Sequence, residues 1–247
     1  MQTSVLPLFY RNVVPLTVER HKGHAVEPVD GFRYAAQTNS VYISAVEFSR
    51  CAQFYPIVFS GDGENLFPVA LLGYREQENL FLREDGSWDA GYIPAYIRRY
   101  PFLPATTQVE GEYLVCIDEG FAGVNQQGRG ERLFNDDGSK TQYTEKVLSF
   151  LSGFQNEHER TQKLCSVLPD LDLLEEKQVK VELPNGKTYL LKGMKVVSRE
   201  KLAKLPDSEI GEMMAHGVLE LIYYHLFSLD RLNELLKRIP AEEGKSV

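Results

Sequence analysis

The strongest structural signal in the chain is QVKVELPNGKTYLLKGMKVV, which runs from Gln178 to Val197. Apolar and polar residues alternate on both sides of its Pro-Asn-Gly tripeptide, and Asn-Gly between two such runs is typical of a tight β-hairpin turn. We therefore predict two antiparallel strands over residues 178–183 and 187–197, with the turn at Pro184–Gly186.

Shorter β signals come earlier in the chain. Apolar runs at 56–59, 68–74 and 79–82 are separated by turn-forming residues, as in antiparallel strands with short connections. Tyr113–Asp118 predicts another strand, in which successive side chains point to opposite faces. The stretch 120–143 is polar and glycine-rich, which predicts a long loop with one strand near Leu133.

Helical signals lie among and after these strands. Ser44 and Glu47 have the spacing of a capping box and predict a helix over 45–54. Pro94–Tyr100 predicts two helical turns, because proline suits the first helical position. Segments 145–154 and 159–168 predict two separate helices, and an apolar stripe from Ile210 to Leu236 predicts a helical C-terminal segment.

These signals together predict an α+β fold, with an antiparallel β-rich body, packed helices and a C-terminal helical segment. No linker divides the chain, so we expect one domain over residues 1–240. Its β-rich part would cover 1–197 and its helical closure 198–240, followed by a polar tail at 241–247.

The composition is that of an ordinary soluble globular protein. The chain has 247 residues, 43% of them hydrophobic and 25% charged, with a formal net charge of −8. An acidic chain repels a nucleic-acid backbone, so we expect no nucleic-acid partner. No apolar run reaches the length of about 18 residues that spans a membrane, and no signal peptide is evident. Three cysteines without a CxxC motif suit a reducing compartment, so the expected location is the cytoplasm.

The histidines show no metal-binding pattern. His21 and His24 are three residues apart, but their surroundings do not predict a helix. His216 and His225 are nine apart, so they would lie on opposite faces of one continuous helix unless it breaks near Gly217. No HxD, HExxH or Cys/His grouping occurs. We expect no metal and no cofactor, while a metal oxygenase would need two histidines and a carboxylate to converge.

The segment Trp88–Phe102 concentrates aromatic side chains beside two arginines. Such residues anchor peptides by stacking and bind carboxylates through paired hydrogen bonds. They make this segment the candidate ligand-binding site, formed by Trp88, Tyr92, Tyr96, Arg98, Arg99 and Tyr100. The alternative is a packed corner of the core, in which Arg98 or Arg99 pairs with a buried carboxylate.

Asp118 and Glu119 follow an apolar strand, a common position for catalytic carboxylates. They point to opposite sides of that strand, so they do not form a ready acid/base pair. With His225 they are the candidate catalytic residues. The alternative is that one carboxylate forms an ion pair with Arg98 or Arg99.

Several blocks of the chain resemble the bacterial SapC family. The resemblance extends from about His21 to Leu236 and is carried by Phe54–Phe59, Pro68–Gly73, Asn79–Phe81, Tyr92–Phe102, Cys116–Glu119, Lys201-Leu202 and Gly217–Leu229. The family is named for an association with bacterial surface layers. The resemblance also implies an accessory or modifying role alongside outer-membrane receptors and flavin-dependent tryptophan halogenases. It implies no catalytic residues.

Two functional hypotheses follow. The first is an accessory or binding protein linked to the bacterial envelope or to peptides, without catalysis, whose partner is a protein or peptide. The second is an enzyme acting on a peptide or small molecule, with carboxylates and arginines in a cleft. The amphipathic faces also allow a homo-oligomer, and no integral membrane contact is expected.

Overall fold

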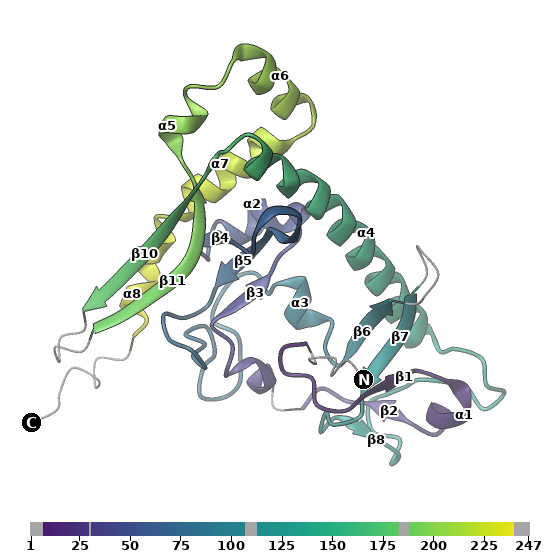
Figure 1. The fold of residues 1–247 in the computed structure, drawn as a ribbon. Coiled ribbons are helices and arrows are strands. Elements are labelled where there is room, and N and C mark those ends of the chain that lie inside the picture. Colours follow the sequence, from purple (N-terminus) through teal and green to yellow (C-terminus); the bar gives the residue numbers. More distant parts are fainter. Residues whose placement is uncertain (1–6, 30, 107–112, 183–187, 240–247) are drawn as a thin grey trace, which may run out of the picture. The chain divides into compact units, whose positions relative to one another are not determined.

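The computed structural model describes residues 7–29, 31–106, 113–182 and 188–239, and it confirms the α+β class (Figure 1). Contacts divide the chain into two compact units, between which the chain passes repeatedly. Unit 1 comprises residues 1–35, 84–87 and 95–156; unit 2 comprises 36–83, 88–94 and 157–247. The prediction of a single domain over 1–240 stays a prediction.

Unit 1 contains two small antiparallel sheets. The first has the order β1-β7-β6, with bounds Val13–Pro15, Tyr113–Asp118 and Phe102–Thr106. The second has the order β8-β2-β9, with bounds Val124–Asn125, Ala25–Val26 and Glu131–Arg132. Strand β7 has the bounds that the sequence predicts, and its pairing aligns Val13 with Asp118. The beginning of β1 is thus held beside the end of β7.

Both faces of β7 are covered near its end, which explains its apolar sequence. Ile117 belongs to a cluster with Phe102, Leu133 and Leu151, whereas Cys116 packs with Tyr10 and Leu103 in a second cluster. The other elements of the unit are α1 (Val18–His21), the 3₁₀ turn η1 (Arg33–Ala35) and α3 (Ala95–Arg98). Because Pro94 precedes α3, its predicted place at the first helical position is off by one residue.

Helix α4 (Gln142–Asp170) is continuous over 29 residues, so the prediction of two helices at 145–154 and 159–168 is wrong. The predicted interruption at residues 155–158 (Gln-Asn-Glu-His) does not occur, because glutamine and glutamate are good helix formers. Pro169 lies at the C-terminal end, where its missing N–H disturbs little of the helix.

Unit 2 is built on a five-stranded antiparallel sheet of order β10-β11-β4-β5-β3. The strands are β3 (Ser40–Tyr42), β4 (Ile57–Ser60), β5 (Phe67–Leu71), β10 (Leu174–Glu182) and β11 (Thr188–Val197). Strands β10 and β11 form the predicted hairpin (green in Figure 1), and the turn predicted at Pro184–Gly186 lies outside the described residues. Residues 79–82 form no strand, because the Asn79 side chain accepts a hydrogen bond from the Phe81 N–H and turns the chain.

Helices surround this sheet and complete unit 2. They are η2 (Ala45–Glu47), α2 (Phe48–Cys51), η3 (Gly63–Asn65), α5 (Arg199–Leu202), α6 (Asp207–Ala215), α7 (Val218–Ser228) and α8 (Arg231–Lys237). The capping box is confirmed, since the Ser44 N–H donates to Glu47 Oε2 at 2.9 Å. The C-terminal stripe is interrupted at Gly217, whose φ of 78° is readily accessible only to glycine. In the part of the chain that is described, no helix is long and apolar enough to cross a membrane.

Candidate functional site

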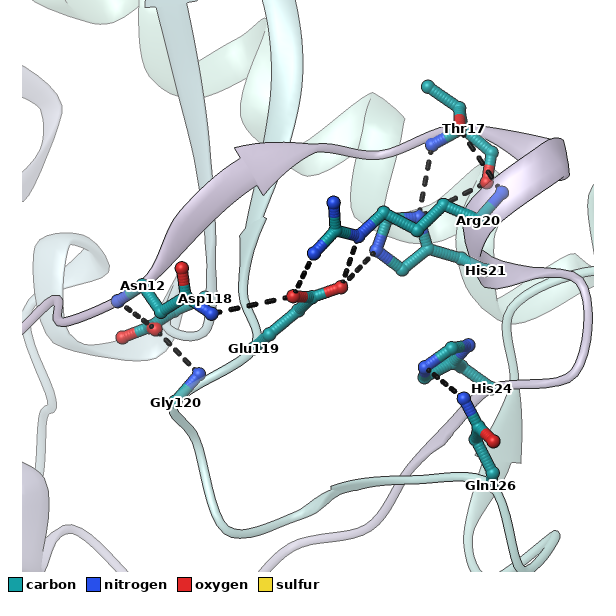
Figure 2. Close-up of polar contacts among 9 residues, drawn as sticks. All are labelled: Asn12, Thr17, Arg20, His21, His24, Asp118, Glu119, Gly120 and Gln126. Atoms are coloured by element: carbon teal, nitrogen blue, oxygen red, sulfur yellow. Dashed lines mark hydrogen bonds and ion pairs between the residues drawn. The ribbon is translucent and has the colours of Figure 1, made fainter.

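The two carboxylates at the end of β7 differ in their surroundings and share one neighbour, Asn12, whose N–H donates to Asp118 and whose Nδ2 donates to Glu119 at 3.4 Å (Figure 2). Asp118 is fully buried and accepts hydrogen bonds from the backbone N–H groups of Arg11 (2.9 Å), Asn12 (2.8 Å) and Gly120 (2.9 Å) and from the Tyr100 hydroxyl (3.1 Å). A Cβ at Gly120 would lie 3.0 Å from Asp118 Oδ1, so glycine suits this close approach. Asp118 therefore holds the chain before β1 against the end of β7.

Glu119 points away from this cluster and is held by Arg20. The Arg20 Nε donates to Oε1 at 2.6 Å and Nη2 donates to Oε2 at 2.5 Å, which makes a two-point ion pair. Hydrogen bonding to Arg20 lowers the pKa of Glu119, so the carboxylate is ionised at neutral pH. Glu119 thus presents hydrogen-bond acceptors and has no proton to give.

His21 lies behind this ion pair without exposure to solvent. Its Nδ1 is 3.1 Å from the carbonyl oxygen of Thr17, and its Nε2 is 3.3 Å from Glu119 Oε1. The approach to Glu119 lacks hydrogen-bond geometry, and Nε2 has no hydrogen-bond partner among the described residues. Burial lowers the pKa of His21, which favours the neutral imidazole.

His24 stands on the other side of the site, where its ring centroid is 5.3 Å from that of His21. Its Nε2 lies 3.0 Å from Gln126 Nε2, a distance for a hydrogen bond whose direction depends on the tautomer. Within the described part of the chain, its buried Nδ1 has no hydrogen-bond partner. His24 therefore carries hydrogen-bonding capacity that the fold does not use.

Arg20, His24 and Glu119 border a pocket of about 550 Å³, which lies entirely within unit 1. Its lining residues are Arg20, His24, Glu119, Val124, Asn125, Gln126 and Gln127. The Asn125 side chain fixes the loop behind it, since Nδ2 donates to the carbonyls of Gly123 (3.0 Å) and Arg129 (2.9 Å). Its Oδ1 in turn accepts from the Gln127 N–H at 3.1 Å. The loop that carries Gln126 and Gln127 is thus held by hydrogen bonds of the Asn125 side chain.

The pocket suits polar recognition. Arg20 and Glu119 compensate each other's charge, while His24 and the amides of the loop supply both donors and acceptors. Across the described residues, no group of three or more His, Cys, Asp or Glu side chains is arranged to hold a metal ion. The lining therefore offers hydrogen-bonding groups of both kinds.

A family model for SapC matches residues 16–235. The chain belongs to the SapC family. No curated protein and no solved structure matches it. The matched region contains all the pocket residues of this SapC-family chain, so its pocket lies within the family domain.

Two residues of the predicted ligand-binding segment are built into unit 2. Trp88 is 8% exposed, and its Nε1 donates to the Tyr55 hydroxyl at 2.7 Å. The Tyr92 hydroxyl donates to Glu47 Oε1 at 2.9 Å. These contacts connect the segment to the core of the unit, as the alternative of a packed corner expects.

The other four residues of the segment lie in unit 1. Arg98 is exposed, with its guanidinium carbon 5.3 Å from the Phe150 ring centroid. Arg99 is buried and lies 4.0 Å from the Tyr96 ring centroid, and Tyr100 donates to Asp118. One of the two carboxylates, Glu119, does pair with an arginine, but the arginine is Arg20 and neither Arg98 nor Arg99, while backbone N–H groups bind Asp118.

His225 belongs to unit 2, where both ring nitrogens take part in the fold. The Val197 N–H donates to Nε2 at 3.0 Å, and Nδ1–H donates to the carbonyl of Ile57 at 2.8 Å. Burial lowers its pKa to about 4. His225 is therefore a neutral link between α7, β4 and β11, which leaves no ring nitrogen for proton transfer.

The sequence interpretation did not select Arg20, His24 or Gln126 as site residues. The three-residue spacing of His21 and His24 is a signal for part of the site, because it brings the two rings within 5.3 Å of each other and His24 lines the pocket. Nothing local to Gln126 or Arg20 indicates their partners, which lie 102 and 99 residues away.

Proposed function

We propose that this SapC-family chain is a binding protein, which captures an uncharged, amide-bearing segment of a protein or peptide partner in the pocket of unit 1. The observation that carries the proposal is the polar pocket itself, in which opposite charges are paired and neutral donors and acceptors remain. It extends the binding role that the aromatic segment first indicated, but at a different set of residues.

The charge balance selects the class of ligand. A cationic or anionic ligand would bring one uncompensated charge to a wall where Arg20 already neutralises Glu119. An amide brings one donor edge and one acceptor edge without net charge, which matches the imidazole of His24 and the carboxamide of Gln126. Unpaired polar groups are costly on both sides of an interface, so such matching gives specificity.

The envelope connection is a separate part of this proposal. It is supported by the surface-layer association after which the SapC family is named, and it makes the chain an accessory component of the bacterial envelope system. A cytoplasmic location, expected from the sequence, belongs to the same proposal. The ionised state of Glu119 argues against a role as general acid, since a general acid must hold a proton.

A second candidate is an enzyme that acts on a peptide or small molecule. The observation in its favour is His21 Nε2 at 3.3 Å from Glu119 Oε1, beside the pocket. A histidine next to a carboxylate is a common arrangement for proton transfer. The two candidates differ in whether a bound peptide is returned unchanged.

The test is NMR titration of the full chain with three acetylated, amidated tripeptides that carry Gln, Glu or Lys between two alanines. We expect the Gln peptide to shift the His24 ring and Gln126 side-chain resonances more than the charged peptides do. His24→Ala and Gln126→Ala should each weaken binding about tenfold, which corresponds to one lost hydrogen bond in a desolvated site. His216→Ala, at an exposed histidine of unit 2, is the matched control and should bind like the wild type.

Absence of pocket shifts with all three peptides, or equal affinity of the pocket variants and the wild type, would overturn the binding proposal. Mass spectrometry of the recovered peptides separates the two candidates. Intact peptides support binding alone, whereas cleaved or modified peptides favour the enzyme.

A further inference from the structure

Arg99 is a buried cation without a charged partner in the described part of the chain. It follows α3 and is 8% exposed. No carboxylate among the described residues forms an ion pair with it, and its Nε has no hydrogen-bond partner there. Its polar contact is with the Tyr10 hydroxyl. Arg98, the preceding residue, is exposed and so differs from it in surroundings while sharing its chemistry.

Aromatic rings take the place of a counter-ion around this guanidinium. Its central carbon lies 4.0 Å from the ring centroid of Tyr96, 4.8 Å from that of Phe154 and 5.8 Å from that of Tyr10. Such cation–π contacts are favourable. They offset only part of the cost of removing a cation from water, which a paired carboxylate would offset more fully.

Four acidic side chains of unit 1 bind partners other than Arg99. Asp118 is bound by backbone N–H groups and Tyr100, and Glu119 is bound by Arg20. Glu27 pairs with Arg129, and Asp136 pairs with Arg132. The fold therefore surrounds the Arg99 guanidinium with aromatic rings, while these four carboxylates bind other groups.

We infer that Arg99 is the receptor for a carboxylate brought by a partner, either an acidic side chain or a peptide C-terminus. The rings cover the faces of the guanidinium, and a carboxylate binds its edge through two parallel N–H···O hydrogen bonds. Tyr96 is half-buried, whereas Phe154 is 8% exposed. Tyr96 is therefore the ring with more room to move when a partner reaches the guanidinium.

The inference is independent of the pocket, since none of the pocket-lining residues contributes to the Arg99 cage. It is tested with the full chain by NMR of the arginine Nε–Hε resonances and by tyrosine fluorescence. The probes are sodium acetate against sodium chloride at equal ionic strength. Three acetylated tripeptides distinguish the two sources of the carboxylate. One has a free C-terminus, one is amidated and has a central Glu, and one is amidated and has a central Gln.

We expect acetate, but not chloride, to shift the Arg99 resonance, and at least one carboxylate peptide to bind more tightly than the Gln peptide. Arg99→Gln should weaken carboxylate binding about tenfold, the loss expected for a two-point charged pair reduced to one neutral hydrogen bond. Arg98→Gln, at the exposed neighbour, should leave it unchanged. Arg99→Lys keeps the charge but loses the fork, so it should bind carboxylate more weakly than the wild type.

Should Arg99→Gln fail to fold, the wild-type titration and Arg99→Lys still decide the question. An Arg99 resonance that acetate and the carboxylate peptides leave unmoved would overturn the inference. So would a carboxylate affinity that is the same in Arg99→Lys and the wild type. Loss of binding in Arg98→Gln alone would also overturn it, by assigning the carboxylate to the exposed arginine.

Discussion

Two regions of the molecule each bury a histidine, but they satisfy its nitrogens differently. In unit 2, His225 accepts from the Val197 N–H and donates to the Ile57 carbonyl. In unit 1, His21 is equally shielded from solvent, yet its Nε2 faces Glu119 without a hydrogen bond. A fully satisfied buried imidazole joins elements of the fold. A buried imidazole such as His21, with one nitrogen unpaired beside a pocket, keeps hydrogen-bonding capacity that the fold does not use.

The same division separates adjacent residues at the end of β7. Asp118 accepts hydrogen bonds from the backbone on the buried side, while Glu119 reaches the pocket on the other side. Strand alternation alone produces this separation, because successive side chains point to opposite faces. A buried carboxylate that holds the fold and a carboxylate that faces the pocket can therefore be neighbours in sequence.

Removal of the satisfied histidine is expected to have the largest effect. His225→Ala would leave the buried Val197 N–H and Ile57 carbonyl unpaired and open a cavity, and it should lower the free energy of unfolding by about 4 kcal/mol. Chemical denaturation measures this. His216→Ala, at the exposed histidine after α6, should change it by less than about 0.5 kcal/mol. Equal losses in the two variants would contradict the joining role of His225.

Acid is expected to have the next largest effect, through the same residue. The pKa of His225 is lowered to about 4, so between pH 6.5 and 4 the unfolded chain binds a proton that the folded chain does not. The contribution of His225 to the free energy of unfolding is therefore fully present above about pH 6.5, and it falls by about 3 kcal/mol as the pH approaches 4. NMR titration of the His225 ring measures its pKa directly. A midpoint near 6.5 would show that burial does not hold the ring neutral.

The smallest expected effect compares the two carboxylates of β7. Asp118→Asn removes one charged acceptor from a set of buried N–H donors and should cost about 2 kcal/mol of unfolding free energy. Glu119→Gln should cost much less, because its partner Arg20 is half exposed and solvent screens the pair. Thermal and urea denaturation of the two variants gives the ranking. The reverse order would contradict the distinction between Asp118, which holds the fold, and Glu119, which faces the pocket.

Much of the fold follows from local sequence patterns. Strand β7, the β10–β11 hairpin, the capping box at Ser44 and the interruption at Gly217 each depend on residues close together in the chain. Local patterns mislead at two places. Residues 155–158 continue α4 and do not separate two helices, and the Asn79 side chain forms a turn within an apolar run.

Less of the candidate site can be predicted. Glu119 is identifiable because it follows an apolar strand, and the paired histidines are visible from their spacing. The partners are not, since Arg20 meets Glu119 across 99 residues of sequence and His24 meets Gln126 across 102. Which arginine pairs with a carboxylate depends on how β1 and β7 align. That alignment is a property of the folded sheet and leaves no mark near either residue.

The route of the chain through the two units has a consequence for protein synthesis. All the segments of unit 1 have been made once residue 156 is added, whereas unit 2 also needs residues from 157 onward. Folding during translation proceeds from the N-terminus. The unit that holds the pocket and Arg99 is therefore the first to have all of its residues translated. Residues 36–83 and 88–94 are translated before the strands and helices of unit 2 from residue 157 onward, with which they fold.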